Sequence, residues 1–357
     1  MKKSNHRNTD FDEEDSPLND TSYMSLSNKT NKHSFRKTRL VDTKKSNTET
    51  HEGIVIAGVG ALWLVNVVLN EHDADVTTIE CKAAGIIVSE HQDASLIAVG
   101  DVVGIELQSN ETPHSGTIVR VAQRHTRLSR VIAAKHKTEQ VVVSNIDQLI
   151  IVMAAAEPFF NVRLIDRYLI AADKGDLEPI ICINKTDLMP IEFIEDQLSV
   201  YQALGIPIVL TSVKKNTGIA NMYALLQGKS SVFSGPSGVG KSSLTNALLG
   251  ENTQSTRTVS EASFKGTHTT SFVKMFALKN GGYLVDTPGL REFAIWNLSI
   301  EELPFYFTEF ENFRHKCKFN TCSHIHEPDC AVLEAVHEGL IHQERYQSYC
   351  NIRESLL

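Results

Sequence analysis

The residues best suited to chemistry form a glycine-rich run, Gly235-Pro236-Ser237-Gly238-Val239-Gly240-Lys241-Ser242. A glycine, four residues and then Gly-Lys-Ser is the spacing of a phosphate-binding loop between a strand and a helix. Glycines let successive backbone N–H groups turn toward phosphate oxygens. Lys241 would reach the terminal phosphates, and the Ser242 hydroxyl would bind Mg²⁺. We therefore expect a nucleotide site here, with Ser243 included at the start of the helix.

A second motif, Asn184-Lys185-Thr186-Asp187, ends a predicted strand and distinguishes guanine from adenine. The Asp187 carboxylate can accept hydrogen bonds from the N1–H and N2–H₂ groups of guanine. Adenine lacks this pair of donors, and its binding would leave the carboxylate unpaired at a cost on the order of 1–3 kcal/mol. The pair Thr211-Ser212, at the end of the following strand, would bring a backbone N–H near guanine O6. The expected ligands are therefore GTP and GDP with Mg²⁺.

The segment Asp286-Thr287-Pro288-Gly289 follows a third strand and would complete the contacts to Mg²⁺ and the γ-phosphate. We expect Asp286 to hold Mg²⁺ through water and the Gly289 N–H to contact the γ-phosphate. Leu290 follows, where Ras-type enzymes have the glutamine that orients the attacking water. Leucine cannot orient water, so hydrolysis is either slow and activated by a partner, or it uses another residue.

A substitute for that glutamine lies in the segment 265–270, Lys-Gly-Thr-His-Thr-Thr. Thr270, or the adjacent Thr269, would coordinate Mg²⁺ when GTP is bound. His268 could orient water or contact RNA, and a solvated loop histidine is an equally good interpretation. The catalytic candidates are therefore His268 and Lys241, and the magnesium candidates are Ser242, Thr270 and Asp286.

The order of these motifs along the chain is unusual. The base-recognition motif comes first, the phosphate loop follows about 50 residues later, and the segment at Asp286 comes last. In Ras-type GTPases the phosphate loop leads and the Asn-Lys-x-Asp motif lies near the end. A circularly permuted order restricts the chain to a few GTPase families.

A second kind of chemistry is indicated near the C-terminus by Cys317, Cys322, His324 and Cys330. Three thiolates and one imidazole suit tetrahedral Zn²⁺ in a closed site. With no open ligand position, one zinc ion would stabilise the fold and would not catalyse. Free cysteines are the less favoured interpretation, and His326 is a competing ligand.

The pattern of hydrophobic residues divides the chain into four parts. Residues 1–50 are polar, and we expect a disordered tail. Residues 51–135 contain β-branched runs interrupted by turn residues, which predicts an RNA-binding OB-fold barrel, with a ligand-free β-sandwich as the alternative. Residues 136–298 alternate strands and helices, which predicts an α/β GTPase domain. Residues 299–357 would form the zinc-binding domain. The predicted fold is therefore multidomain: a β-barrel, a circularly permuted α/β P-loop domain and a small helical domain.

Helices are expected where apolar residues recur every three to four positions. This pattern predicts helices at 161–174, 191–204 and 243–249, and a further helical segment from about 330 to 349.

The overall charge is −8, with 22% charged and 41% hydrophobic residues, which is typical of a soluble protein and argues against a generally basic nucleic-acid binder. No apolar run of 18 or more residues predicts a membrane span, and no signal sequence is evident, so we expect a cytoplasmic protein. The segment 29–45 has seven Lys or Arg residues against one acid. A solvated tail is the favoured interpretation, and a basic arm along RNA is the alternative.

The chain closely resembles the circularly permuted GTPases of the RsgA (YjeQ) family, over about residues 53–350. The resemblance rests on the motif order, Gly-Pro-Ser-Gly-Val-Gly-Lys-Ser-Ser-Leu, Gly-Thr-His-Thr-Thr, Asp-Thr-Pro-Gly-Leu and the cysteine cluster ending Glu-Pro-Asp-Cys. It implies a GTPase that binds the small ribosomal subunit and its 16S rRNA late in maturation, is stimulated by that subunit and leaves after hydrolysis. It also implies a monomer with no membrane partner.

Two departures from the family pattern remove positive charge from the expected RNA-facing side. The segment 81–87 is nearly neutral where the family has a basic Arg-Gly stretch, and Thr267 replaces a common arginine. RNA contacts could therefore be weaker or placed elsewhere, because phosphate neutralisation supplies much of such affinity. The arginines that could compensate are Arg120, Arg124, Arg127 and Arg130, although the last three could instead be paired with local acids. The alternative functions are a GTP-switched RNA-binding module with negligible turnover and a GTPase acting on another structured RNA.

Overall fold

A computed structural model describes residues 50–70, 73–89, 95–108, 115–132, 138–250, 273–287 and 297–357. All of them belong to one compact unit, residues 43–357. Three predictions fall outside the described ranges: the polar tail up to residue 49, the segment 265–270, and the part of the third motif that follows Thr287.

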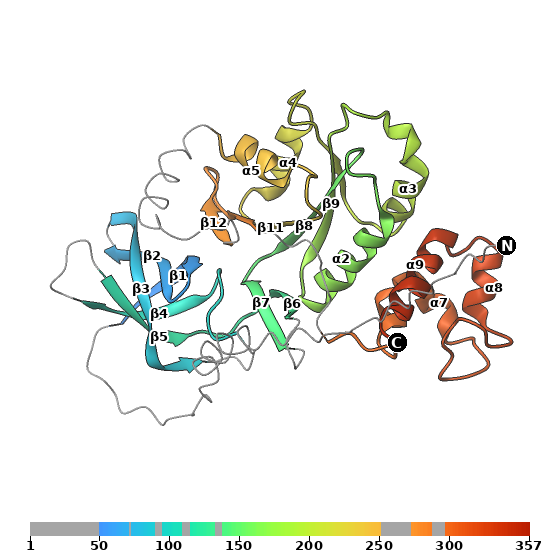
Figure 1. Cartoon of the computed structure of the whole chain (residues 1–357), viewed down its shortest axis with the longest axis horizontal. Coiled ribbons are helices and arrows are strands. Elements are labelled where there is room, and N and C mark those ends of the chain that lie inside the picture. Colours follow the sequence, from blue (N-terminus) through green and yellow to red (C-terminus); the bar gives the residue numbers. More distant parts are fainter. Residues whose placement is uncertain are drawn as a thin grey trace, which may run out of the picture. The chain divides into compact units, whose positions relative to one another are not determined.

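The first five strands close into a small barrel (Figure 1). These strands are β1 (Thr50–Val59), β2 (Leu62–Asn70), β3 (Asp73–Ser89), β4 (Val102–Gln108) and β5 (Ser115–Val121). They pair in the order β1-β2-β3-β5-β4, and β4 pairs back with β1. Only the β3–β5 pair is parallel among these strands. The predicted OB-fold barrel is confirmed.

A hairpin of β6 (Arg127–Ile132) and β7 (Thr138–Ser144) follows the barrel and precedes a second group of strands. This group comprises β8 (Gln148–Ala154), β9 (Glu178–Asn184), β10 (Ile208–Leu210), β11 (Ser230–Ser234), β12 (Lys274–Ala277) and β13 (Tyr283–Asp286). Their order is β10-β9-β8-β11-β13-β12, and only the β12–β13 pair is antiparallel. Ala57 of β1 pairs with Lys274 of β12, so the barrel and this sheet share hydrogen bonds.

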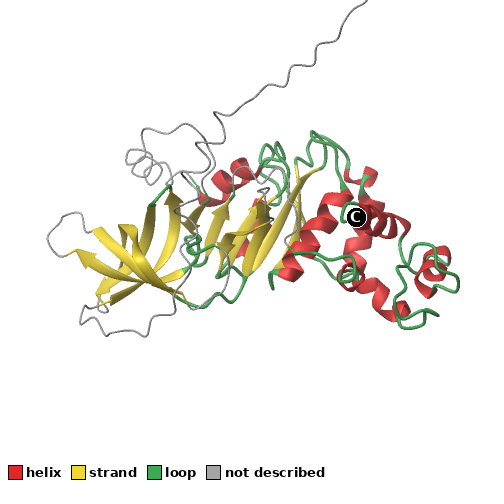
Figure 2. Cartoon of the chain, turned by 60° about the horizontal axis from the view of Figure 1, so that its bottom comes forward, coloured by secondary structure: helices red, strands yellow, loops and turns green. Residues whose placement is uncertain are grey.

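Helices cover both faces of this sheet, as the two views show (Figures 1 and 2). They are α2 (Val162–Lys174), α3 (Glu195–Ala203), α4 (Ile219–Leu226) and α5 (Lys241–Leu249). The strand β8 is buried along its whole length. Leu149, Ile151 and Met153 join the core under α2 and α3. The alternate residues Ile150, Val152 and Ala154 join the core under α4 and α5. This period of two is expected for a strand buried on both faces.

The strand order reverses between β8 and β11. From β8 the chain moves outward through β9 to β10, and it then returns to β11 and continues to the other side through β13. Ligands of open α/β sheets bind outside the carboxyl ends of the strands at such a reversal. Asn184 ends β9 and the glycine-rich loop follows β11, so this topology brings the two predicted motifs to one edge.

The predicted helix at 161–174 is confirmed: Asn161 caps α2 by accepting a hydrogen bond from the Arg163 N–H at 3.1 Å. The segment 191–204, predicted as one helix, consists of a 3₁₀ turn, Ile191–Phe193, followed by α3. The predicted helical segment at 330–349 consists of two helices, α8 (Ala331–His337) and α9 (Gln343–Glu354). Gly339 separates them with φ of 74°, a left-handed conformation that ends helices.

The C-terminal region has its own core. Before α8 it contains two 3₁₀ turns, η2 (Leu303–Tyr306) and η3 (Thr308–Phe310), and the short helix α7 (Glu311–Arg314). Phe307, Phe310 and Tyr349 pack together at its centre, with ring centroids 5.0–5.3 Å apart. Together with the barrel and the α/β sheet, this helical region confirms the predicted three-part fold. Among the described helices, none is long and apolar enough to cross a membrane.

Candidate nucleotide and zinc sites

The glycine-rich run forms a loop between β11 and α5, as predicted. Gly235 has φ of 147° and Gly240 has φ of 94°, both in the region that favours glycine. A Cβ on Gly235 would lie 2.1 Å from the Val152 carbonyl oxygen, and one on Gly240 would lie 2.4 Å from Asn184 Nδ2. The loop therefore packs so closely against β8 and the end of β9 that no side chain fits at either position.

Lys241 and Ser242 begin α5 and Asp286 ends β13, so all three lie at the carboxyl edge of the sheet. Lys241 begins α5, and its Nζ donates to the carbonyl oxygens of Gly235 at 2.6 Å and Pro236 at 2.8 Å. Burial lowers the pKa of Lys241, and the Asp286 carboxylate opposes this shift. Ser242, in the first turn of α5, is exposed. This combination of an ammonium group, a hydroxyl and a carboxylate fits a magnesium–phosphate ligand.

The base-recognition motif is bonded directly to the phosphate loop. Asn184 Nδ2 donates to the Val239 carbonyl oxygen at 2.9 Å, and Asn184 Oδ1 accepts from Thr211 Oγ1 at 3.1 Å. Lys185 has a left-handed φ of 61°, and its Nζ donates to the Glu157 carbonyl oxygen. The sequence analysis did not identify Glu157, because only the fold brings the loop after β8 next to β9.

Asp187 is oriented by the chain that follows β10. Its Oδ1 accepts a hydrogen bond from Ser212 Oγ at 2.5 Å, and this bond is the main reason that its pKa is lowered. The Ser212 N–H donates to the Thr217 carbonyl oxygen at 3.0 Å. The side chain of Ser212 therefore contacts the base-recognition motif, while its N–H, which we expected near guanine O6, has a partner within its own turn.

Three predicted nucleotide or catalytic residues lie outside the described parts of the chain: His268, Thr270 and Gly289. Leu290 and Thr267 lie outside them as well. Their roles remain predictions, whereas Ser237 and Ser243 are described and exposed at the loop and in the first turn of α5.

The cysteine cluster brings together the four predicted metal ligands, whose donor atoms all lie within 4.8 Å of one another. Cys317 Sγ lies 3.9 Å from Cys330 Sγ, and His324 Nδ1 lies 3.6 Å and 3.5 Å from these two sulfurs. Tetrahedral zinc with Zn–S bonds of about 2.3 Å separates two sulfurs by about 3.8 Å. The donor set therefore fits Zn²⁺, and His324, not His326, belongs to it.

The loop that contains these ligands is held by polar contacts from both sides. The Glu327 carboxylate accepts from the backbone N–H groups of Ser323 at 2.8 Å and Ile325 at 3.2 Å. The Tyr346 hydroxyl donates to the His324 carbonyl oxygen, and the Tyr349 hydroxyl donates to that of Ser323, both at 2.8 Å. These outer contacts orient the ligands as second-sphere groups do in metal sites.

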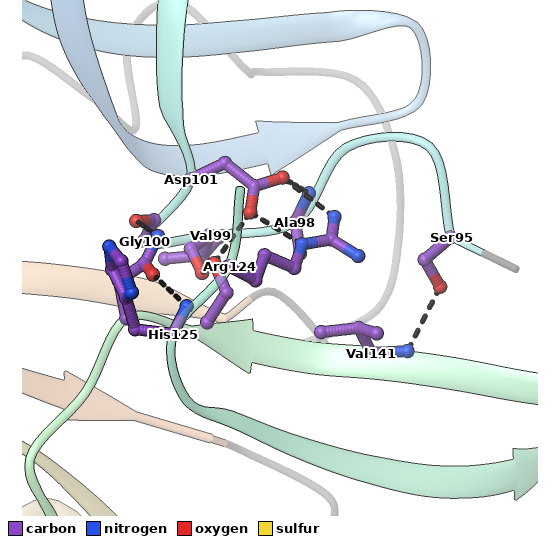
Figure 3. Close-up of polar contacts among 10 residues, drawn as sticks. Ser95, Ala98, Val99, Gly100, Asp101, Arg124, His125 and Val141 are labelled. Carbon is purple, nitrogen blue, oxygen red and sulfur yellow. Dashed lines mark hydrogen bonds and ion pairs between the residues drawn. The ribbon is translucent and has the colours of Figure 1, made fainter. Parts of the chain in front are cut away.

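The arginines considered as compensating RNA contacts have local partners. Arg124 is only 4% exposed and forms a double ion pair with Asp101, with Nε–Oδ1 and Nη2–Oδ2 distances of 2.7 Å (Figure 3). Arg127 lies 3.4 Å from Glu139, and Arg120 lies 3.3 Å from Glu52. Arg130 Nε donates to Gln140 Oε1 at 2.8 Å. Arg124 is therefore a structural residue and is unavailable to RNA.

The barrel, the reversed-order α/β sheet with its phosphate loop, and the Cys₃His cluster together define a circularly permuted GTPase with a barrel and a C-terminal region that carries a cysteine–histidine cluster. The model of the RsgA GTPase family matches residues 121–296. The small ribosomal subunit biogenesis GTPase RsgA of Chlorobaculum parvum is 40% identical over 313 residues, which cover 86% of this chain and 99% of that protein. The corresponding protein of Chlorobaculum tepidum is 41% identical over the same shares. The chain belongs to the RsgA family of GTPases.

Solved structures agree with this assignment. YjeQ from Thermotoga maritima is 32% identical, with a TM-score of 0.66 over 86% of this chain and 99% of that one. YloQ, described as a circularly permuted GTPase, is 27% identical, with a TM-score of 0.62 over 88% of this chain and 98% of that one. The similarity therefore extends over the barrel, the α/β sheet and the C-terminal region together.

Proposed function

We propose that this protein is a GTPase that assists late maturation of the small ribosomal subunit, binding it in the GTP state and leaving after hydrolysis. The observation that supports this proposal best is the 40% identity to a small ribosomal subunit biogenesis GTPase over 99% of that relative. The direct contact between the phosphate loop and the base-recognition motif supports the same conclusion, because Asn184 and Val239 join them into one site.

The geometry supports the following roles for the nucleotide ligands. Backbone N–H groups of the loop 235–240 and Lys241 hold the phosphates, since the glycines keep the loop clear of side chains. The Asp187 carboxylate, oriented by Ser212, accepts hydrogen bonds from the N1–H and N2–H₂ groups of guanine. Because the Ser212 N–H is bonded to Thr217, we assign the contact to guanine O6 to the next N–H, that of Val213. Mg²⁺, which would neutralise charge on the phosphates, would be held by Ser242, Asp286 and Thr270.

Turnover is proposed to depend on the ribosomal partner. Leu290 cannot orient a water molecule, so the intrinsic rate would be low, and His268 is the candidate that would act when the partner is bound. The small ribosomal subunit with its 16S rRNA is the proposed partner, and the protein would act as a monomer in the cytoplasm. The Cys₃His cluster would hold one structural Zn²⁺, and its spacing supports that assignment.

A second candidate is a GTP-switched RNA-binding module with negligible turnover. It is favoured by Leu290 and by the nearly neutral segment 81–87, which lies within β3 and exposes 69% of Ile86. A GTPase acting on another structured RNA is a further alternative. Competition between small subunits and that RNA for binding would separate it from the first proposal.

The deciding experiment measures GTP hydrolysis by the full chain with and without purified small subunits. Large subunits serve as the particle control, and the Lys241→Ala variant serves as the enzyme control. Strong stimulation by small subunits alone, absent in Lys241→Ala, supports the proposal. Tight GTP binding without any stimulation would favour the binding-module alternative.

A further inference from the structure

Helix α2 is buried on two opposite sides and belongs to two cores. Ile165, Tyr168 and Ala172 lie in the core between α2 and the sheet. Ile170 instead joins the aromatic core of the C-terminal region, which contains Phe307, Phe310 and Tyr349. The helix that follows the first strand of the GTPase sheet is therefore also part of the metal-binding region.

A buried ionic cluster reinforces this shared packing. Arg345 of α9 donates from Nη1 to Asp166 Oδ1 of α2, and it donates from Nε and Nη2 to the two Glu309 carboxylate oxygens at 2.6 Å and 3.1 Å. The Tyr201 hydroxyl of α3 donates to the same Asp166 oxygen at 2.8 Å. Arg345 is 4% exposed and Asp166 is 1% exposed. The guanidinium also lies 4.4 Å from the centroid of the Phe307 ring.

The same helix α9 contacts the metal-binding loop. Tyr346 and Tyr349, one and four residues after Arg345, donate from their hydroxyls to the carbonyl oxygens of His324 and Ser323. The position of α9 therefore depends on the loop that zinc would order. Arg345 connects that position to α2.

At its N-terminal end, α2 adjoins the nucleotide site. The loop before it supplies the Glu157 carbonyl oxygen to Lys185, and a Cβ on Gly238 would lie 3.8 Å from Pro158 Cδ. Tyr168 is 2% exposed and lies on the side of α2 that faces the sheet. Burial raises the pKa of its hydroxyl, and the neighbouring Ser234 side chain and Gly235 backbone oppose the rise. A shift of α2 would therefore disturb both the phosphate loop and Lys185.

We propose that Arg345 is a positioning residue for the nucleotide site: by holding α2 against α9, it makes nucleotide affinity depend on the metal-ordered C-terminal region. The proposal rests on the proposed GTPase function and adds a regulatory link to it. Removing the guanidinium would leave the Asp166 carboxylate buried without its cationic partner, which strongly disfavours the present packing of α2. A partner that docks on the C-terminal region could then alter nucleotide affinity by displacing α9.

The coupling between zinc binding and GDP binding must act in both directions, because coupling between two binding equilibria is reciprocal. If zinc binding strengthens GDP binding through α9 and α2, GDP must strengthen zinc binding by the same factor. Zinc transfer from the full protein to a chelator should therefore be less favourable when GDP is bound.

The first test compares Arg345→Met with wild type, both as the full chain loaded with zinc. GDP affinity is measured with a fluorescent GDP analogue, and zinc content is measured on the same samples. We expect zinc to remain bound and the GDP dissociation constant to rise at least about fivefold, the lower end of typical coupling. The matched control is Lys318→Met, which also removes a positive charge from the C-terminal region but breaks only exposed contacts, an ion pair with Asp329 and a contact with the Phe319 ring.

A wild-type GDP dissociation constant in zinc-loaded Arg345→Met would overturn the proposal. If this variant fails to fold, Asp166→Leu and Glu309→Gln combined with Arg345→Met remove all three charges and leave neither carboxylate isolated. The triple variant should retain zinc but bind GDP more weakly, and unchanged affinity there would also refute the link.

A merely structural role predicts lower stability with unchanged GDP affinity in the folded fraction. The chelator measurement also separates the two roles. Bound GDP should reduce zinc transfer to the chelator in wild type, and it should reduce this transfer less in Arg345→Met. Equal protection in both proteins contradicts the proposal. Failure of wild type to bind GDP at all would instead overturn the proposed GTPase function.

Discussion

At the scale of single residues, Asp187 shows how a short motif depends on a partner from a distant segment, the chain that follows β10. The hydrogen bond from Ser212 Oγ lowers its pKa, and Lys214 Nζ lies 4.0 Å from its other oxygen. Because the folded-state pKa is lowered, the favourable contribution is present above the unfolded pKa and is lost as the pH falls through the folded one. The carboxylate is therefore ionised at neutral pH, as guanine recognition requires.

Replacing this carboxylate should change the base preference. In Asp187→Asn the amide can no longer accept hydrogen bonds from both guanine donors. The affinity for GDP should therefore fall about 10- to 100-fold, while the affinity for xanthosine diphosphate should rise. Competition against a fluorescent GDP analogue measures both. Asp196→Asn in α3 is the control for loss of a carboxylate. Retention of guanine preference by Asp187→Asn would disprove the assignment of the base-recognition motif.

Lys241 is the second single residue with a defined expectation. Lys241→Ala removes the ammonium group that would neutralise the terminal phosphates, so hydrolysis should fall at least about 100-fold, as for other preorganised electrostatic groups. Turnover is measured with small subunits present, and circular dichroism checks the fold. Lys279→Ala, in the exposed turn between β12 and β13, should keep wild-type turnover. Full activity in Lys241→Ala would refute its catalytic role.

At the scale of elements, the phosphate loop and the end of β9 form one unit. Asn184 donates across to Val239, and the missing side chain of Gly240 leaves the space that the Asn184 amide occupies. Gly240 is therefore required both for its left-handed backbone and for the space that it leaves to Asn184.

Gly240→Ala tests this contact. Its Cβ would meet Asn184 Nδ2 at 2.4 Å in a backbone with φ of 94°. Gly205→Ala is the matched control, because Gly205 has φ of 75° and no atom within 4 Å of its Cβ position. Both variants should lose about 1 kcal/mol of unfolding free energy from left-handed strain. Only Gly240→Ala should also lose GDP affinity, and equal GDP titrations for both would contradict the proposed crowding.

Asp101 joins the barrel to Arg124 and to the β6–β7 hairpin. Its carboxylate also accepts from Ser144 Oγ at 2.6 Å and from the Ala98 N–H at 2.7 Å. Arg124→Met leaves this carboxylate buried without its cation, which should lower the unfolding free energy by about 3–5 kcal/mol. Urea denaturation followed by tryptophan fluorescence measures the loss. Arg130→Met, on the partly exposed hairpin, should cost less than about 1 kcal/mol, and similar losses for the two would refute the special role of Arg124.

At the scale of the whole molecule, the C-terminal region packs against α2, and its Cys₃His cluster has the geometry of a zinc site. Cys322→Ser removes one of four ligands, so zinc should be lost and residues 299–357 should lose protection from hydrogen exchange. The link through Arg345 predicts weaker GDP binding as well. Cys350→Ser is the control, since Cys350 lies in the same region outside the cluster. Normal zinc content in Cys322→Ser would refute the ligand set.

Much of the fold followed from local patterns. The start of α2 at Asn161, the phosphate loop between β11 and α5, and the four clustered metal ligands agree with expectations from short sequence windows. The break between α8 and α9 was missed because apolar spacing continues across Gly339 while the backbone there turns left-handed. The contact of Lys185 with Glu157 had no sequence signal, because β8 and β9 become neighbours only in the sheet.

The sequence by itself determined the candidates: which residues are proposed to hold phosphate, guanine and zinc, because those requirements are met by residue types at short spacings. Only the tertiary structure decided which charges are available and which are structural. Arg124 is paired with Asp101, and Arg345 reaches Asp166 across 179 positions of sequence. The physical reason is that a buried ion pair depends on the strand order and helix packing that bring distant residues together, and short sequence patterns do not encode that proximity.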